Sequence, residues 1–206
     1  MRIEQPGNAD MEALALARRS GWPEDLRVLI ERFPREQWEG HANLGEMARF
    51  WLSRHAMFRE LSGSIEEIMA QFRSGATPAA DFPRQLVPRL QFLLQQLGVH
   101  HQIEDLHYFP IFRAADERLA RGFDVLEGDH HAIHADMAAT AETANALLRA
   151  LAASDAASLT RRGDDYAQAS GALIKGLVRH LDDEEDLIVP LILERGEDAL
   201  GVAHHG

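Results

Sequence analysis

Two segments of this chain carry a histidine, a carboxylate four residues later and a proline ten residues after the histidine. In the first these are His100, Glu104 and Pro110, and in the second His180, Glu184 and Pro190. Residues four apart lie one turn apart on one face of a helix, so each histidine–glutamate pair can bind a single centre. A repeat that keeps residues of metal-ligand type predicts a site built from two similar halves.

Three further histidines fall on the apolar stripes of predicted helices: His55, His130 and His134. A single histidine on an apolar face is usually a hydrogen-bonded core residue, and one histidine–glutamate pair is common on exposed helices. The two repeats in core register argue against both readings. Burying two carboxylates with five imidazoles is strongly unfavourable unless a cation compensates the charge. The seven residues together therefore predict a metal site.

Imidazole and carboxylate ligands without sulfur suit iron, manganese or zinc. Seven ligands are too many for one ion, but they fit two ions that share bridging carboxylates. We expect one metal on His130, His134 and His180, the other on His55 and His100, and Glu104 and Glu184 between them. With one bridging oxygen, the first metal is saturated and the second keeps an open coordination position for a small ligand.

Hydrophobic periodicity predicts four long helices that carry these residues, and strand signals are essentially absent. The helices span about residues 35 or 41 to 72, 83 or 88 to 109, 119 or 123 to 152, and 158 to 193. Their inward stripes pass through Trp51, His55 and Phe58; Leu97, His100 and Glu104; Glu127, His130 and His134; and Leu177, His180 and Glu184. Long helices with short loops predict an all-α, antiparallel up-down-up-down four-helix bundle.

The bundle is expected to occupy residues 41–195 and to follow an N-terminal extension, residues 1–40, with short helices at about 11–17 and 22–34. We expect the extension to pack on the bundle as a cap of low functional content. Residues 196–206, including His204 and His205, are expected to form a flexible tail.

Composition excludes several classes of protein. The net charge of −12 argues against nucleic-acid binding, and no apolar run is long enough for a membrane span. With no cysteine, the chain has no disulfide and no thiolate ligand. A cytoplasmic location is expected.

The chain resembles the hemerythrin-like (HHE) cation-binding proteins over about residues 41–195, through His55, the His100–Glu104 pair, the His130–His134 pair and the His180–Glu184 pair. The resemblance implies a non-haem di-iron centre, oxo- or hydroxo-bridged, that binds or senses O2, NO or iron. Zinc and manganese are the alternative metals. Oxygen-carrying hemerythrins place the last carboxylate five residues after its histidine, which would select Glu185, whereas the internal repeat selects Glu184.

Residues beside the seven have weaker indications. His101 and His131 adjoin proposed ligands and could replace them if the helix register shifts by one residue, but they are expected to flank the core. Glu127 is a candidate to orient His130, and His107 and Tyr108 are either donors to the site or boundary residues.

Two other functions stay open. An open di-iron site can perform oxidase or peroxidase chemistry, or donate iron for iron–sulfur cluster repair, although cluster-repair relatives usually carry an N-terminal cysteine and residues 1–40 contain none. No residue stands out as a dedicated general acid or base, so a small-molecule binding protein is the leading prediction. The third possibility is a metal-free helical bundle that serves as a platform for a partner.

Overall fold

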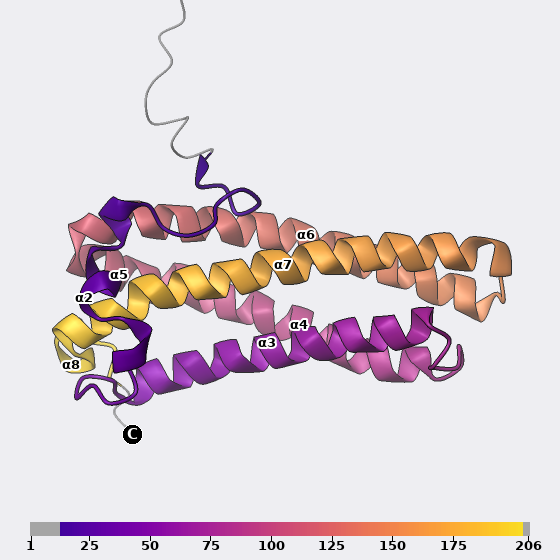
Figure 1. Ribbon diagram of the computed structural model, residues 1–206, viewed down its shortest axis with the longest axis horizontal. Coiled ribbons are helices and arrows are strands. Elements are labelled where there is room, and N and C mark those ends of the chain that lie inside the picture. The colour runs from indigo at the N-terminus through magenta and orange to yellow at the C-terminus, as the bar shows by residue number, and fades with distance from the viewer. Residues whose placement is uncertain (1–12, 204–206) are drawn as a thin grey trace, which may run out of the picture. The chain divides into compact units, whose positions relative to one another are not determined.

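The computed structural model describes residues 13–203, and within this range the chain is helical and contains no strand, as the sequence predicts (Figure 1). Its long helices are α3 (Glu46–Arg73), α4 (Phe82–Ile103), α6 (Ala120–Ala152) and α7 (Ala156–Arg195). The shorter elements are η1 (Glu24–Leu26), α2 (Val28–Arg32), η2 (Arg35–Gln37), η3 (Glu104–Tyr108), α5 (Phe109–Ala115), η4 (Glu117–Leu119) and α8 (Glu197–Leu200). Helices α6 and α7 begin and end close to the predicted limits, whereas α3 starts later than predicted, at Glu46, and α4 ends earlier, at Ile103. Helix α4 starts at Phe82, next to the earlier of the two predicted starts, and contains Pro88.

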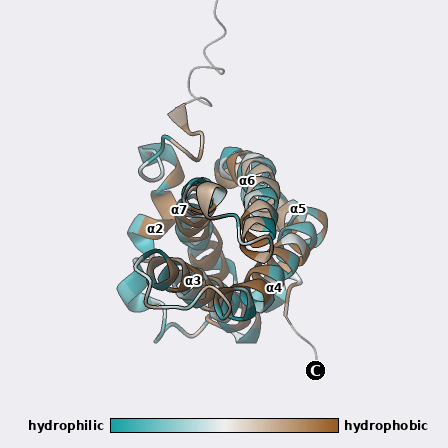
Figure 2. Cartoon of the chain, turned by 90° about the vertical axis from the view of Figure 1, so that its right-hand side faces the viewer, coloured by the Kyte–Doolittle hydropathy of each residue, from teal (hydrophilic) through white to brown (hydrophobic). Residues whose placement is uncertain are grey.

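Each long helix is amphipathic, with hydrophilic and hydrophobic residues on the same ribbon (Figure 2). The predicted inward stripe of α3 is confirmed, because Trp51, His55 and Phe58 are all buried. The stripe of α7 is also confirmed, since Leu177, His180 and Glu184 are fully buried. These two helices therefore present the predicted residues to the core.

The predicted stripe of α6 is wrong in part. His130 is buried, but Glu127 and His134 are exposed, and Leu126 and Ile133 are buried in their place. Steps of three and of four residues both stay on one helix face, so a stripe assigned one residue off still fits the helical periodicity. The alanine-rich sequence of α6 has few large side chains to fix its orientation.

The chain divides into two compact units. The described part of the first comprises residues 13–55, 101–131 and 178–203, and the second comprises residues 56–100 and 132–177. Within the second unit, the loop 74–81 connects α3 to α4, and Phe72 stacks on Phe82 at 4.1 Å between ring centroids. A three-residue turn, 153–155, connects α6 to α7 there.

In the first unit, the N-terminal segment joins the hydrophobic core. Trp22, Leu26 and Leu29 belong to the same buried cluster as Phe112 and Ile188. The short helix expected over residues 22–34 is present as η1 and α2. Of the helix expected over 11–17, residues 11 and 12 lie outside the described range, residue 13 is helical, and residues 14–17 form turns and a bend.

At the C-terminal end of α4 the helix widens into η3, a π-helical turn in which the Phe109 N–H donates to the Glu104 carbonyl. The next helix, α5, starts at Phe109, and Pro110 stands in its first turn. Such a turn adds one residue to the helical repeat, so the buried positions step by five from Glu104 to Phe109. The sequence reading, with regular steps of three and four, did not include this insertion.

The described part of the C-terminal tail is ordered by packing, unlike the expected flexible tail. Leu200 and Val202 are buried, and the Glu197 carboxylate accepts a hydrogen bond of 2.8 Å from the Ala48 N–H at the start of α3. His204 and His205 lie outside the described residues. None of the described helices has an apolar stretch long enough to cross a membrane.

Candidate metal centre

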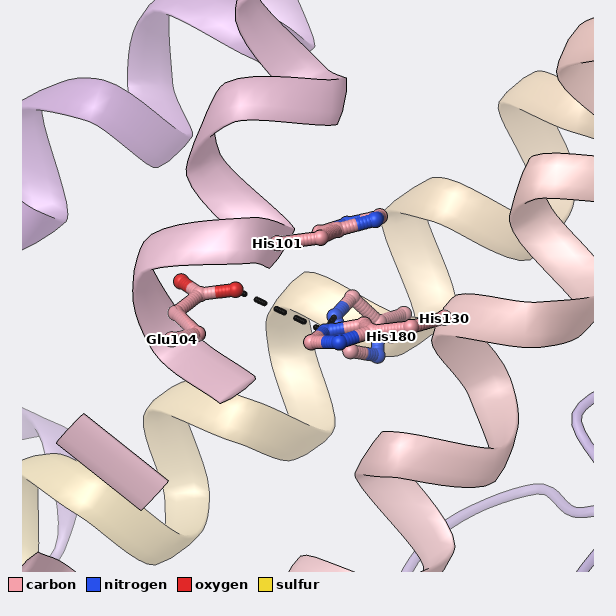
Figure 3. A group of neighbouring side chains, drawn as sticks. All are labelled: His101, Glu104, His130 and His180. Atoms are coloured by element: carbon pink, nitrogen blue, oxygen red, sulfur yellow. Dashed lines mark hydrogen bonds and ion pairs between the residues drawn. The ribbon is translucent and has the colours of Figure 1, made fainter. Parts of the chain in front are cut away.

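Four buried side chains converge in the first unit: His101, Glu104, His130 and His180 (Figure 3). One possible ligand atom from each lies within 4.8 Å of the other three. They come from the end of α4, the start of η3, the N-terminal third of α6 and the C-terminal half of α7. The Nε2 atoms of His130 and His180 are 3.2 Å apart, and Glu104 Oε2 is 3.5 Å from His130 Nε2.

His101 stands beside His130 with the two rings stacked, 3.9 Å between centroids. The prediction that His101 flanks the core is wrong, because its side chain is fully buried. The actual buried step is Leu97, His101, Glu104 rather than Leu97, His100, Glu104. His100 is half-buried and is the last residue of the second unit, where its ring lies 5.1 Å from that of Phe58.

A second set of ligand atoms in the same unit includes Glu104 again, now with His55 and Glu184, all within 4.8 Å of one another. Glu184 Oε1 lies 3.7 Å from His55 Nε2, and Glu184 Oε2 lies 3.3 Å from His180 Nε2. The Trp51 indole N–H donates a 2.7 Å hydrogen bond to Glu184 Oε1 and orients the carboxylate. Glu184 therefore reaches both sets with one oxygen each, and Glu104 is common to both.

The neighbouring acid, Glu185, lies on the other side of His55. Its Oε1 atom is 3.0 Å from His55 Nδ1, so it contacts the ring nitrogen that points away from Glu184. Of the two acids considered from the sequence, Glu184 is the one placed between the histidines.

Carboxylates also contact the Nδ1 atoms of the other two histidines. Asp105 Oδ1 lies 2.7 Å from His130 Nδ1, and Asp129 Oδ2 lies 3.3 Å from His180 Nδ1. A carboxylate that accepts from Nδ1–H fixes the tautomer that leaves the Nε2 lone pair available to a metal. All three histidines are therefore oriented with Nε2 toward the site.

Sequence reasoning did not identify these three carboxylates as partners of the histidines. It proposed Glu127 for His130, but Glu127 is exposed and pairs with Arg113 at 3.2 Å. Asp105 has that role because η3 carries it next to α6. His131 is exposed, as expected, and His107 is exposed as well. Tyr108 is half-buried, with its ring 4.9 Å from that of Trp51.

The charged forms of Glu104 and His130 are unfavourable in the protein alone. Burial, and then the adjacent negative charge of Glu184, raise the pKa of Glu104 well above its usual value. Burial lowers the pKa of His130. Burial also acts to lower the pKa of His180, but its contacts with Asp129 and Glu184 outweigh this and raise the pKa to about 9. A cation between the two glutamates would remove their repulsion.

The donor set fits a metal of the iron, manganese or zinc type. It offers imidazole nitrogens and carboxylate oxygens, all buried and converging, and the chain contains no cysteine. His134 is exposed and belongs to neither set of clustered ligand atoms in the described residues. Within the first unit, the structure thus brings together His55, Glu104, His130, His180 and Glu184 of the seven predicted residues, and adds His101.

Comparison with known proteins gives one match. No curated protein and no solved structure matches the chain, but the family model of the hemerythrin HHE cation binding domain matches residues 46–192. This range includes every histidine and glutamate of the centre and most of the chain. The buried histidine–glutamate centre and the family match together show that the chain belongs to the hemerythrin HHE cation-binding domain family.

Proposed function

We propose that this protein holds a non-haem di-iron centre and uses it to bind or sense O2, or another diatomic molecule such as NO. One observation carries the proposal: two carboxylates are shared between two sets of histidines. Glu184 directs one oxygen toward His55 and the other toward His180. Shared carboxylates of this kind are what two adjacent metal ions need and one ion does not.

The first metal would be held by His101, His130 and His180, with His101 taking the place that the sequence pattern gave to His134. The second would be held by His55 and His100. His100 is included because α4 is continuous from Phe82 to Ile103, which fixes His100 one turn before Glu104. Glu104 and Glu184 would contribute to both metals.

This assignment keeps the asymmetry expected from ligand counting. One metal has three imidazoles and the other has two, so the second has the open coordination position. Iron bound there would supply reversible binding of a diatomic ligand. The protein's own residues orient the histidines and exclude water: Trp51 and Leu181 are buried in the first unit, and Trp51 also holds Glu184.

We also propose that the four long helices form an antiparallel bundle. Two short connections, 74–81 and 153–155, join α3 to α4 and α6 to α7. Connections this short favour antiparallel neighbours, which supports an antiparallel four-helix bundle.

Metal analysis of the purified protein tests the proposal most directly. We expect about two irons per chain and an absorption spectrum that changes reversibly as O2 is added and removed. One zinc per chain, or no metal, would contradict the di-iron proposal. Irreversible oxidation with turnover of peroxide would instead support an oxidase or peroxidase.

A further inference from the structure

The N-terminal segment places two arginines behind the histidines of the metal centre. Arg19 binds both oxygens of Asp129, with Nη1 2.8 Å from Oδ1 and Nη2 in contact with Oδ2. Arg35 Nη1 donates a 2.7 Å hydrogen bond to Glu185 Oε2. Asp129 and Glu185 are the carboxylates that contact His180 and His55 through Nδ1.

Two similar chains of contacts result. One runs from Arg19 through Asp129 to His180, and the other from Arg35 through Glu185 to His55. In each, the arginine is more than 100 residues from the carboxylate in sequence. The third carboxylate, Asp105, comes from η3 and not from the N-terminal segment.

The position of Arg19 is defined by further contacts. Its side chain is almost completely buried, and its Nε donates a 2.6 Å hydrogen bond to Asp183, the residue before Glu184. Its Nη1 also donates to the Leu14 carbonyl at 2.9 Å, and its guanidinium lies 5.1 Å from the centroid of the Trp22 ring. A buried guanidinium is very unfavourable unless it is paired, so this residue is fixed by its two carboxylates.

Arg35 is held in a comparable way at the edge of the unit. Its Nε donates to Asp186 at 2.8 Å, and its Nη2 donates to the Asp182 carbonyl at 2.8 Å. Its side chain is 41% exposed, so a substitution there leaves less buried charge unpaired than one at Arg19.

We propose that residues 13–40 contribute to the metal centre through two positioning residues, Arg19 and Arg35. Arg19 acts on His180 through Asp129, and Arg35 acts on His55 through Glu185. This inference rests on the proposed function, because it takes both histidines to be metal ligands. Each guanidinium fixes the orientation of its carboxylate and offsets part of its negative charge. Without it, the carboxylate would pull more strongly on the Nδ1 proton and make the imidazole a stronger donor.

The effect on bound iron has a defined sign. Removing a positive charge near the metal favours its higher oxidation state, so loss of either arginine shifts the reduction potential of the centre downward. Loss of the fixed orientation also weakens binding, since partners that orient metal ligands are typically worth about 10-fold to 100-fold in affinity.

The test compares Arg19→Gln and Arg35→Gln with a matched control, Arg32→Gln. Arg32 is in the same segment but pairs at the surface with Glu194, with its side chain 64% exposed. Fe(II) affinity is measured without O2 by competition with a chelator, and reduction potential by titration of the loaded protein. We expect the two test variants to bind at least one iron about 10-fold more weakly, and to have a lower potential, while the control matches the wild type.

Two further measurements separate positioning from simple folding support. Arg19→Lys keeps the positive charge but loses the bidentate contact with Asp129. It should therefore restore the reduction potential more fully than the Fe(II) affinity. In the Co(II)-loaded protein, the exchangeable Nδ1–H signals of the ligand histidines are resolved by NMR. Arg19→Gln should shift the His180 signal and Arg35→Gln the His55 signal, each leaving the other in place.

The outcomes distinguish this inference from the proposed function. If the wild type binds metal but both test variants match it in affinity, potential and NMR signals, the inference is wrong and the di-iron proposal stands. If the wild type binds no metal, both the inference and the di-iron proposal are wrong. If Arg19→Gln does not fold, Arg35→Gln alone decides, because its guanidinium is partly exposed.

Discussion

His101 and His134 differ from their predicted roles for the same physical reason. On a helix, steps of three and of four residues both return to one face, so the pair His100–His101 fits the stripe of α4 in either register. The periodicity of α6 is equally permissive around His130. Packing decides both cases, since His101 is fully buried and His134 is exposed.

Substituting these two histidines tests the assignment residue by residue. His101→Ala should lose one of the two irons, or weaken its binding by more than ~10-fold, because it removes a nitrogen ligand from a buried set. His134→Ala is the matched control on an exposed turn of α6, and it should retain both irons. Iron content per chain and Fe(II) affinity measure the difference. The reverse result would restore the ligand set expected from the sequence.

The carboxylates behind the histidines show what sequence patterns cannot supply. Asp105, Asp129 and Glu185 each stand next to a ligand or candidate ligand in sequence, which is a signal, but it does not say which histidine each one contacts. Asp105 contacts His130 on another helix from within the π-helical turn η3, which the sequence pattern did not indicate. Contacts of this kind depend on the placement of whole elements.

At the scale of elements, the two halves of the repeat are alike in sequence and different in backbone. Pro190 lies inside the continuous helix α7, whereas Pro110 follows the π-helical turn η3. His180 and Glu184 lie four residues apart on the buried face of α7, whereas the buried histidine before Glu104 in α4 is His101, three residues earlier. π-helical turns inside α-helices are frequent at functional sites, and this one begins at Glu104, which is common to both ligand sets.

The limits of α6 and α7 follow from local signals and were predicted well. The role of the N-terminal segment was not. Its apolar residues correctly indicated a cap, but nothing in the periodicity shows that Arg19 reaches Asp129 and Asp183. The segment was predicted to have low functional content, and the role that we propose for Arg19 and Arg35 disagrees with that prediction.

The C-terminal element α8 provides a testable contribution to stability. Glu197 accepts hydrogen bonds from the Ala48 and Met47 N–H groups, at 2.8 and 3.3 Å, and so caps the start of α3. Glu197→Ala should lower the free energy of unfolding by about 1 kcal/mol, as loss of an N-cap usually does. Asp198→Ala removes the next acid, which is exposed, and should have little effect. Urea unfolding of both variants measures the difference; equal stability would show that the cap contributes nothing.

At the scale of the whole molecule, the sequence predicted the helical class because amphipathic periodicity is a property of each helix by itself. It predicted the type of site because buried glutamates and histidines at a fixed spacing are rarely stable without a cation between them. The ligand set depends instead on how the helices are rotated about their axes. That rotation is set by packing and, at Glu104, by one inserted residue in the helical turn.

The stability of the whole molecule should depend on metal. In the metal-free protein, Glu104 and Glu184 are buried side by side, and the pKa of Glu104 is raised by burial and by the charge of Glu184. A metal that binds only the folded state stabilises it by about 2.7 kcal/mol at 100 times its dissociation constant. We therefore expect Fe(II) to raise the midpoint of thermal unfolding and a chelator to lower it.

Glu104→Gln makes this test specific. Glutamine cannot ionise, so it removes the unfavourable ionisation of Glu104 beside Glu184, and the metal-free variant should be more stable than the metal-free wild type. The same change removes a shared ligand, so Fe(II) should stabilise the variant less than it stabilises the wild type. Glu127→Gln alters an exposed glutamate of α6 and should change neither quantity. A metal-free Glu104→Gln protein less stable than the wild type would mean that the glutamate pair is not a source of strain, and the electrostatic case for a cation between Glu104 and Glu184 would fail.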